Sequence, residues 1–186
     1  MAIRMRTQWH TRGPKSIEDR AGVIGFNIWK IANEAWKRME KEGFRVGGDQ
    51  QVITLVMEMV AFLVQIADRM VYGQMDEAER ARFINALGGH LAATVENNMF
   101  DLFGPGEYRK SLIDTLNARG ADYAEFDFPG GTPSYAALRY LGDKMAEAMA
   151  GTDSKWVIEQ VIEIEAPEAV KTIRRLVHEV LGIKLD

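Results

Sequence analysis

The sequence predicts a single-domain, all-α bundle of about seven mainly antiparallel helices. Apolar residues recur at helical spacing along most of the chain, and glycines and prolines divide this pattern into segments of helix length. The length of 186 residues, with 47% hydrophobic and 27% charged residues, is typical of one globular domain. We expect residues 1–15 to form a flexible basic arm and residues 16–186 to form one helical domain.

The first two predicted helices differ in how their apolar residues are distributed. Over Ile17–Glu42 the polar and apolar residues occupy opposite faces, which predicts an amphipathic helix. Over Asp49–Tyr72 the apolar residues cover most of the circumference, which is typical of a helix at the centre of a bundle. This segment is long enough to span a bilayer, but Glu58, Asp68 and Arg69 would each cost about 2.5–3.5 kcal/mol near mid-bilayer. We therefore expect a buried helix of a soluble bundle and no membrane partner.

The third predicted helix begins at a capping box, in which Asp76 and Glu79 accept hydrogen bonds from backbone amides, and extends to about Asn98. Gly88-Gly89 lies inside it, although each glycine costs about 1 kcal/mol relative to alanine. The pair predicts either a kink or a close approach between helices. A shorter helix follows over about Glu107–Arg119.

An irregular segment, Ala121–Gly131, alternates aromatic and acidic residues. Two interpretations are equally consistent with this pattern: the aromatics close the end of the bundle, or they cap a pocket or meet a partner. Thr132 is expected to be the N-cap of the next helix, with Pro133 as its first residue.

The last part of the chain contains one ambiguous segment. Lys155–Glu165 is rich in β-branched residues and fits either a strand or a helix, and we favour a helix because no nearby segment offers a strand partner. Pro167 is expected to break the chain there and to start a final helix that ends at Gly182.

Composition excludes several functional classes. The chain has no cysteine, which excludes disulfides, thiolate metal sites and a cysteine nucleophile. The net charge of −4 gives no global basic field for nucleic acid or anionic lipid. The first fifteen residues are locally basic but lack the apolar core of a signal peptide, so we expect a cytoplasmic location.

The common catalytic and metal-binding motifs are missing from the sequence. None of the three histidines, His10, His90 and His178, follows a glutamate by three residues, as a ferritin-like di-metal site requires. No Gly-x-Ser-x-Gly or phosphate-binding loop is present. We expect no cofactor and favour a non-enzymatic role, while a looser mononuclear metal site with Glu58, Asp68 and His90 stays open.

The candidate ligand-binding residues lie on the second predicted helix and beside it. A narrow polar strip interrupts the apolar surface of that helix and contains Glu58, Gln65, Asp68 and Arg69. His90 joins this set because it lies beside Gly88-Gly89 on the third helix. The strip is either a solvent-exposed edge of a mostly buried helix or the lining of a crevice that holds a small ligand.

The segment Ile31–Phe44, IANEAWKRMEKEGF, resembles the first helix of TetR-type transcriptional repressors and ends in the same Gly-Phe turn. The length and the all-helical prediction also suit that family, and the resemblance implies a recognition helix with polar and basic residues after Phe44. In this chain Val52–Val64 is instead a long apolar segment whose only ionisable residue is Glu58. We therefore expect no nucleic-acid partner.

Two hypotheses about function follow. Four tryptophans, ten methionines and an almost wholly apolar helix are more apolar surface than a small bundle is expected to hide. The first hypothesis is therefore a non-enzymatic interaction or regulatory protein that acts as a homodimer and engages a further protein partner. The alternative is a small-molecule- or metal-binding bundle with a polar crevice around Glu58, Asp68 and His90.

Overall fold

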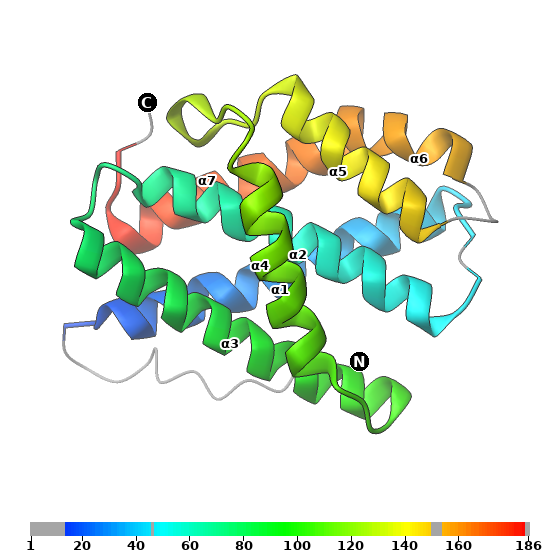
Figure 1. Ribbon diagram of the computed structural model, residues 1–186, viewed down its shortest axis with the longest axis horizontal. Helices are drawn as coiled ribbons and strands as arrows, with labels where there is room; N and C mark the ends of the chain where they lie inside the picture. Colours follow the sequence, from blue (N-terminus) through cyan, green and yellow to red (C-terminus); the bar gives the residue numbers. More distant parts are fainter. Residues whose placement is uncertain (1–13, 46, 150–153, 185–186) are drawn as a thin grey trace.

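The computed structural model describes residues 14–45, 47–149 and 154–184, and every regular element in these ranges is helical (Figure 1). The all-α prediction is confirmed. The predicted basic arm lies outside the described residues except for Pro14 and Lys15. The α-helices are α1 (Ile17–Lys41), α2 (Asp49–Val71), α3 (Glu77–Phe103), α4 (Tyr108–Tyr123), α5 (Tyr135–Ala148), α6 (Ser154–Gln160) and α7 (Ala166–Leu181).

The helices are arranged around α2, which contacts α1, α3, α4, α5 and α7. In Figure 1, α3 lies on one side of α2 and α5 and α6 lie on the other, while α1 and α7 pass behind α2 and α4 crosses the front. The closest packing is between α1 and α3, where α1 presents Gly22 and Gly25. A Cβ atom added to Gly22 would lie 3.2 Å from Nε2 of His90, so the two helices approach closely because this side chain is missing.

The chain itself covers most of α2. Fifteen of its 23 residues are buried, and they include Glu58. Although α2 has the length and composition of a membrane-spanning helix, 72% of its apolar stretch is buried inside the protein, as in the core helix of a bundle. Seven methionines are also buried: Met39, Met57, Met59, Met70, Met99, Met145 and Met149. Much of the apolar surface from which a homodimer is predicted, that of the methionines and of α2, is therefore covered by the chain's own helices. The homodimer stays a prediction.

Three predicted helix boundaries are corrected. The α3 helix continues past Asn98 to Phe103, and α4 continues past Arg119 to Tyr123, which shortens the irregular segment. Thr132 is not an N-cap, because its N–H closes the 3₁₀ turn Pro129–Gly131 by donating to the carbonyl of Pro129. Ser134 takes that role: its backbone is extended and its side chain accepts from the N–H of Ala137.

The predicted helix over Lys155–Glu165 is confirmed, but the predicted break at Pro167 is wrong. The α6 helix leads through a π-helical turn, Val161–Glu165, directly into α7. In that turn the N–H of Ala166 donates to the carbonyl of Val161, five residues earlier. Proline lacks an N–H and clashes with the carbonyl four residues before it in a regular α-helix. The wider π turn precedes Pro167, so the proline occupies the first turn of α7, where its missing N–H is tolerated.

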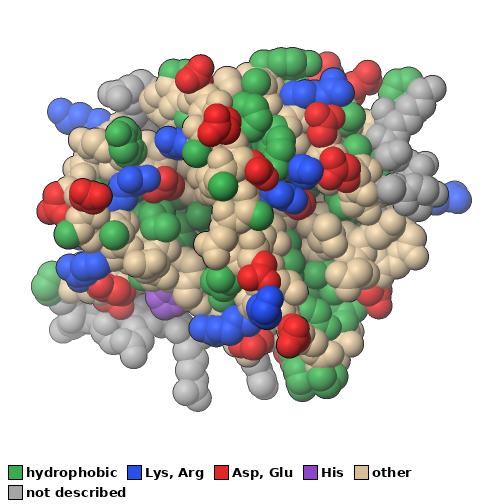
Figure 2. Space-filling view, viewed as in Figure 1, with side chains coloured by type: hydrophobic (Ala, Val, Ile, Leu, Met, Phe, Trp, Pro, Cys, Tyr) green, Lys and Arg blue, Asp and Glu red, His purple; other side chains and the backbone are tan. Residues whose placement is uncertain are grey.

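Basic and acidic side chains alternate over the face that α4 crosses, with apolar side chains between them (Figure 2). Several are ion pairs within one helix, such as Lys110 with Asp114 on α4 and Arg139 with Asp143 on α5. Exposed pairs of this kind contribute little to stability. They also leave this face without a large field of one sign.

Candidate functional site

Three residues of the polar strip of α2, Glu58, Gln65 and Asp68, face α3 and α4, and the two carboxylates among them meet arginines there. Glu58 is 5% exposed and accepts two hydrogen bonds from Arg119 of α4, from Nε and Nη2 at 2.6 Å each. Asp68 accepts from Arg80 of α3, from Nε at 2.8 Å and from Nη2 at 2.6 Å. Neither carboxylate therefore lies on a solvent-exposed edge of the bundle. The hydrogen bonds that Arg80 donates to Asp68 raise the pKa of Arg80, and those that Arg119 donates to Glu58 raise the pKa of Arg119.

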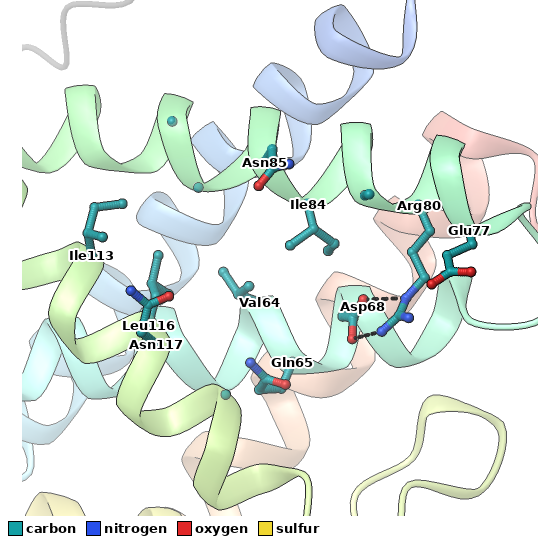
Figure 3. A pocket seen from close by; sticks show the side chains of 14 residues that line it. Val64, Gln65, Asp68, Glu77, Arg80, Ile84, Asn85, Ile113, Leu116 and Asn117 are labelled. Atoms are coloured by element: carbon teal, nitrogen blue, oxygen red, sulfur yellow. Dashed lines mark hydrogen bonds and ion pairs between the residues drawn. The ribbon is translucent and has the colours of Figure 1, made fainter.

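A pocket of about 570 Å³ lies between α2, α3 and α4 (Figure 3). Each helix contributes apolar lining, namely Val64, Ala81, Ile84, Ile113 and Leu116. Each helix also contributes one amide side chain, namely Gln65, Asn85 and Asn117. The Asp68–Arg80 pair closes one end of the pocket, as the close-up shows. The arrangement offers apolar walls with hydrogen-bonding groups at three points, which is the usual composition of a small-molecule site.

Three glycines also line this pocket: Gly88 and Gly89 of α3 and Gly120 of α4. Among the described residues, a Cβ atom added to Gly89 meets no atom within 4 Å, and one added to Gly88 meets Leu116 Cδ1 alone, at 4.0 Å. The close helix–helix approach considered for this pair therefore occurs elsewhere, at Gly22 and Gly25 of α1. At Gly88 and Gly89 the missing side chains leave open space, and that space is part of the pocket.

The structure brings only two of the five predicted site residues, Gln65 and Asp68, into this pocket. Glu58 is held by Arg119, and Arg69 lies over the ring of Phe128, 5.4 Å from its centroid. His90 faces Gly22 of α1. Glu58, Asp68 and His90 thus do not form the metal site left open above, and the described part of the chain contains no group of three metal-ligating residues.

Sequence reasoning missed the arginines and the amides that α3 and α4 contribute. Arg80, Asn85 and Asn117 have no local pattern that marks them, because their role depends on how three helices pack. The one signal in the sequence was Gly88-Gly89, whose cost in helix stability was evident but whose reason was not.

The aromatic residues of the segment between α4 and α5 pack into the bundle. Tyr123 is fully buried, and its ring contacts those of Phe62, Phe126, Phe128 and Tyr140. This arrangement is the one in which the aromatics close the end of the bundle. Burial raises the pKa of Tyr123 well above its usual value.

An ionic network connects this aromatic cluster to α4. The Tyr140 hydroxyl donates to Asp122 Oδ2, and Arg119 Nη1 donates to the same oxygen at 3.1 Å. The hydrogen bond from Tyr140, together with the one from Arg119, lowers the pKa of Asp122 from its ordinary value of 3.8. Burial, followed by this hydrogen bond, raises the pKa of Tyr140. Arg119 therefore links Glu58 on α2 to Asp122 and Tyr140.

We expect Asp122 to make the stability of the protein depend on pH in the acid range. The pKa of Asp122 is lower in the folded chain than in the unfolded chain. Asp122 therefore contributes fully to stability above about pH 3.8, and this contribution is lost as the pH falls through the folded pKa. The Asp122→Asn variant lacks this titration. Urea unfolding from about pH 7 to about pH 3 should show the gap between wild type and variant closing below about pH 4. Parallel stability curves for the two proteins would contradict this role of Asp122.

No protein-family model matches the chain, and neither the curated proteins nor the solved structures compared with it include a significant match. The likeness to TetR-type repressors thus stays limited to Ile31–Phe44. In the structure, the residues that follow this segment lead into the buried helix α2. The functional argument consequently depends on the geometry of the pocket.

Proposed function

We propose that this protein binds a small, largely uncharged molecule in the pocket between α2, α3 and α4, and that it does so as a binding or regulatory protein. The proposal keeps the crevice hypothesis but moves the crevice: its residues are Gln65 and Asp68 with partners from α3 and α4. Of the three charged residues in the described lining, Asp68 and Arg80 neutralise each other through two hydrogen bonds, and Glu77 lies beside Arg80 at the same end of the pocket (Figure 3). The other described lining residues are uncharged. Ligand charge is therefore not what this pocket is arranged to recognise.

The observation that carries the proposal is that Gly88 and Gly89 lower the stability of α3 with no structural reason in the packing. Both lie in the interior of α3, and neither has the positive φ angle that favours glycine. Neither is needed for helix packing, since an added Cβ would meet almost nothing. Two helix-interior glycines cost about 2 kcal/mol together relative to alanine. The space they leave in the pocket supports a ligand as the reason for this cost.

The lining indicates the class of ligand. A volume of about 570 Å³ lies in the range of pockets that enclose drug-sized molecules. Flat apolar surface on the ligand would contact Val64, Ile84 and Leu116, while amide-like edges would pair with Gln65, Asn85 or Asn117. A neutral aromatic compound that carries an amide or a similar donor–acceptor group has this combination.

An interaction role through a homodimer has weaker support. The exposed large apolar residues on α3 and α4 are Phe100, Leu102 and Ile113, and Ile113 belongs to the pocket lining. The remaining apolar surface of α2 is covered by the chain itself. We therefore place ligand binding before self-association.

Substituting the pocket glycines should make the ligand-free protein more stable while it removes binding. Gly89→Ala is expected to stabilise the protein by about 0.5–1 kcal/mol, because alanine restricts the unfolded chain and favours the helix. Gly142→Ala on α5 is the matched control: its Cβ would lie 3.1 Å from Ile158 Cγ2 and 3.3 Å from Ile158 Cα, so this variant should lose stability. Urea unfolding monitored by circular dichroism measures both. A loss of stability in Gly89→Ala would show that the glycine serves packing.

Binding is tested with a panel of neutral aromatic amides that begins with benzamide, followed by ¹H–¹⁵N NMR. Wild-type protein should show shifts concentrated at the backbone amides of Gly88, Gly89 and Gly120. Gly89→Leu places a side chain in the pocket and should abolish these shifts, whereas Ala136→Leu on the exposed face of α5 should leave them unchanged. Absence of localised shifts with every member of the panel, or equal shifts in Gly89→Leu, would refute the proposal.

A further inference from the structure

A second cavity, of about 310 Å³, lies at the opposite end of α2 from its N-terminus and shares no lining residue with the first. Its walls come from the end of α2, the 3₁₀ turn Pro129–Gly131 and the residue Lys184 after α7. These three segments are far apart in the sequence and lie together at the upper left of Figure 1.

Two cations line this cavity, Arg69 and Lys184, and its lining contains no carboxylate among the described residues. Arg69 makes no ion pair in the described part of the chain, whereas the neighbouring Asp68 is fully engaged by Arg80. The described lining of the cavity therefore carries charge of one sign, in a protein whose overall net charge is −4.

The hydrogen-bonding capacity of Arg69 is largely unused. Among the described residues its buried Nε has no hydrogen-bond partner, and its Nη2 donates a long bond of 3.4 Å to the carbonyl of Tyr123. Its guanidinium lies over the ring of Phe128, with Cζ 5.4 Å from the ring centroid, which is a cation–π contact. A half-buried guanidinium with unsatisfied donors is costly, and a bound anion removes that cost by accepting from it.

The turn beside Arg69 leaves room for a ligand to approach. Gly130 and Gly131 both have positive φ angles, 55° and 72°. A Cβ added to Gly131 would lie 2.7 Å from Met70 Cγ, so this glycine is required by the packing of the turn against α2. The turn thus packs closely against Met70 of α2. Its backbone, which has no side chain at Gly130 or Gly131, forms one wall of the cavity.

We propose that this cavity is an oxyanion site, in which Arg69 and Lys184 hold a phosphate or carboxylate group. Arginine matches planar or bidentate oxyanions with its parallel N–H donors, and lysine adds a point charge. The site is independent of the proposed ligand pocket, because the two cavities have no lining residue in common. Phosphate and carboxylate share this recognition chemistry, and the experiment separates them.

The test measures thermal stability and binding heat of the full chain with sodium phosphate and, separately, with sodium acetate. Sodium chloride at the same ionic strength is the reference for non-specific screening. At least one of the two oxyanions should raise the melting temperature above this reference, and the one that gives the larger shift identifies the class. No rise above the chloride reference with either anion would overturn the proposal.

Variants assign the effect to the cavity. Arg69→Met should raise the apparent Kd for the oxyanion by about tenfold or more, which corresponds to a loss of about 1.4 kcal/mol or more of binding free energy. Arg69→Lys, which keeps the charge but loses the planar donors, should also weaken it. Lys184→Gln should weaken binding less, and Lys171→Gln, an exposed lysine on α7 outside the cavity, should leave it unchanged. In phosphate-free buffer Arg69→Met should fold nearly as well as wild type, because among the described residues it loses the long bond to Tyr123 and the contact with Phe128 but no ion pair. Unchanged binding in Arg69→Met, or in Arg69→Lys if the methionine variant does not fold, would contradict the assignment.

Discussion

Replacing Arg119 by methionine is expected to destabilise the protein by about 3–5 kcal/mol, because it leaves the Glu58 carboxylate buried without a cation. Glu58 is 5% exposed, and the two hydrogen bonds that it accepts from described residues, at 2.6 Å each, both come from Arg119. The same substitution removes the bond from Arg119 to Asp122. Urea unfolding monitored by circular dichroism gives the free energy of unfolding from which the loss is calculated.

Two comparisons separate a buried charge from lost packing. The double variant Glu58→Met/Arg119→Met removes both charges and should recover most of the stability, since a buried ion pair and an apolar pair of similar volume are often equivalent. Arg139→Met removes an arginine from an exposed pair with Asp143 and should change stability by less than about 1 kcal/mol. If Arg119→Met costs no more than Arg139→Met, Glu58 lies on a solvent-exposed edge in solution.

The sequence was informative about the elements because helical periodicity is local. The almost wholly apolar segment over Asp49–Tyr72 predicted a central helix, and α2 is buried by five other helices. The predicted ends of helices were wrong where a contact between distant residues or an unusual turn determined where the helix begins or ends. The π turn before Pro167 accommodates a proline that is expected to break a regular helix, and Ser134 caps α5 because Thr132 is used by the preceding 3₁₀ turn.

The candidate site was less predictable because its residues come from three helices. Periodicity placed Gln65 and Asp68 on one strip of α2, but it contained no information on which helix would cover that strip. Asp68 pairs with a residue 12 positions away and Glu58 with one 61 positions away, and no local pattern identifies either partner. The glycine pair carried the clearest signal, because its cost in helix stability predicted a kink or a close approach between helices. In the structure the pair instead lines the pocket.

Arg38→Met is the second substitution that we expect to cost about 3–5 kcal/mol, and here the two partners of the ion pair should differ. Glu165 lies in the π turn and its side chain is fully buried, whereas the side chain of Arg38 on α1 is 41% exposed. Arg38 donates to one oxygen of Glu165, at 3.0 Å from Nε and 2.7 Å from Nη2, and Gln160 donates to the other at 3.2 Å. Without Arg38 the buried carboxylate keeps only the amide of Gln160.

The reverse substitution, Glu165→Met, removes the buried charge and leaves an arginine that water can reach, so its cost should stay within about 1.5 kcal/mol. Arg175→Met serves as the control for the loss of an arginine side chain, because its contact with Glu179 is long, 3.9 Å, and both side chains are well exposed. Denaturant unfolding of the three variants gives the order directly. A larger loss for Glu165→Met than for Arg38→Met would mean that the carboxylate is needed for its hydrogen bonds in the π turn. The predicted order, with the larger loss in Arg38→Met, would instead mean that Arg38 is needed because it neutralises the carboxylate of Glu165, which the π turn places in the core.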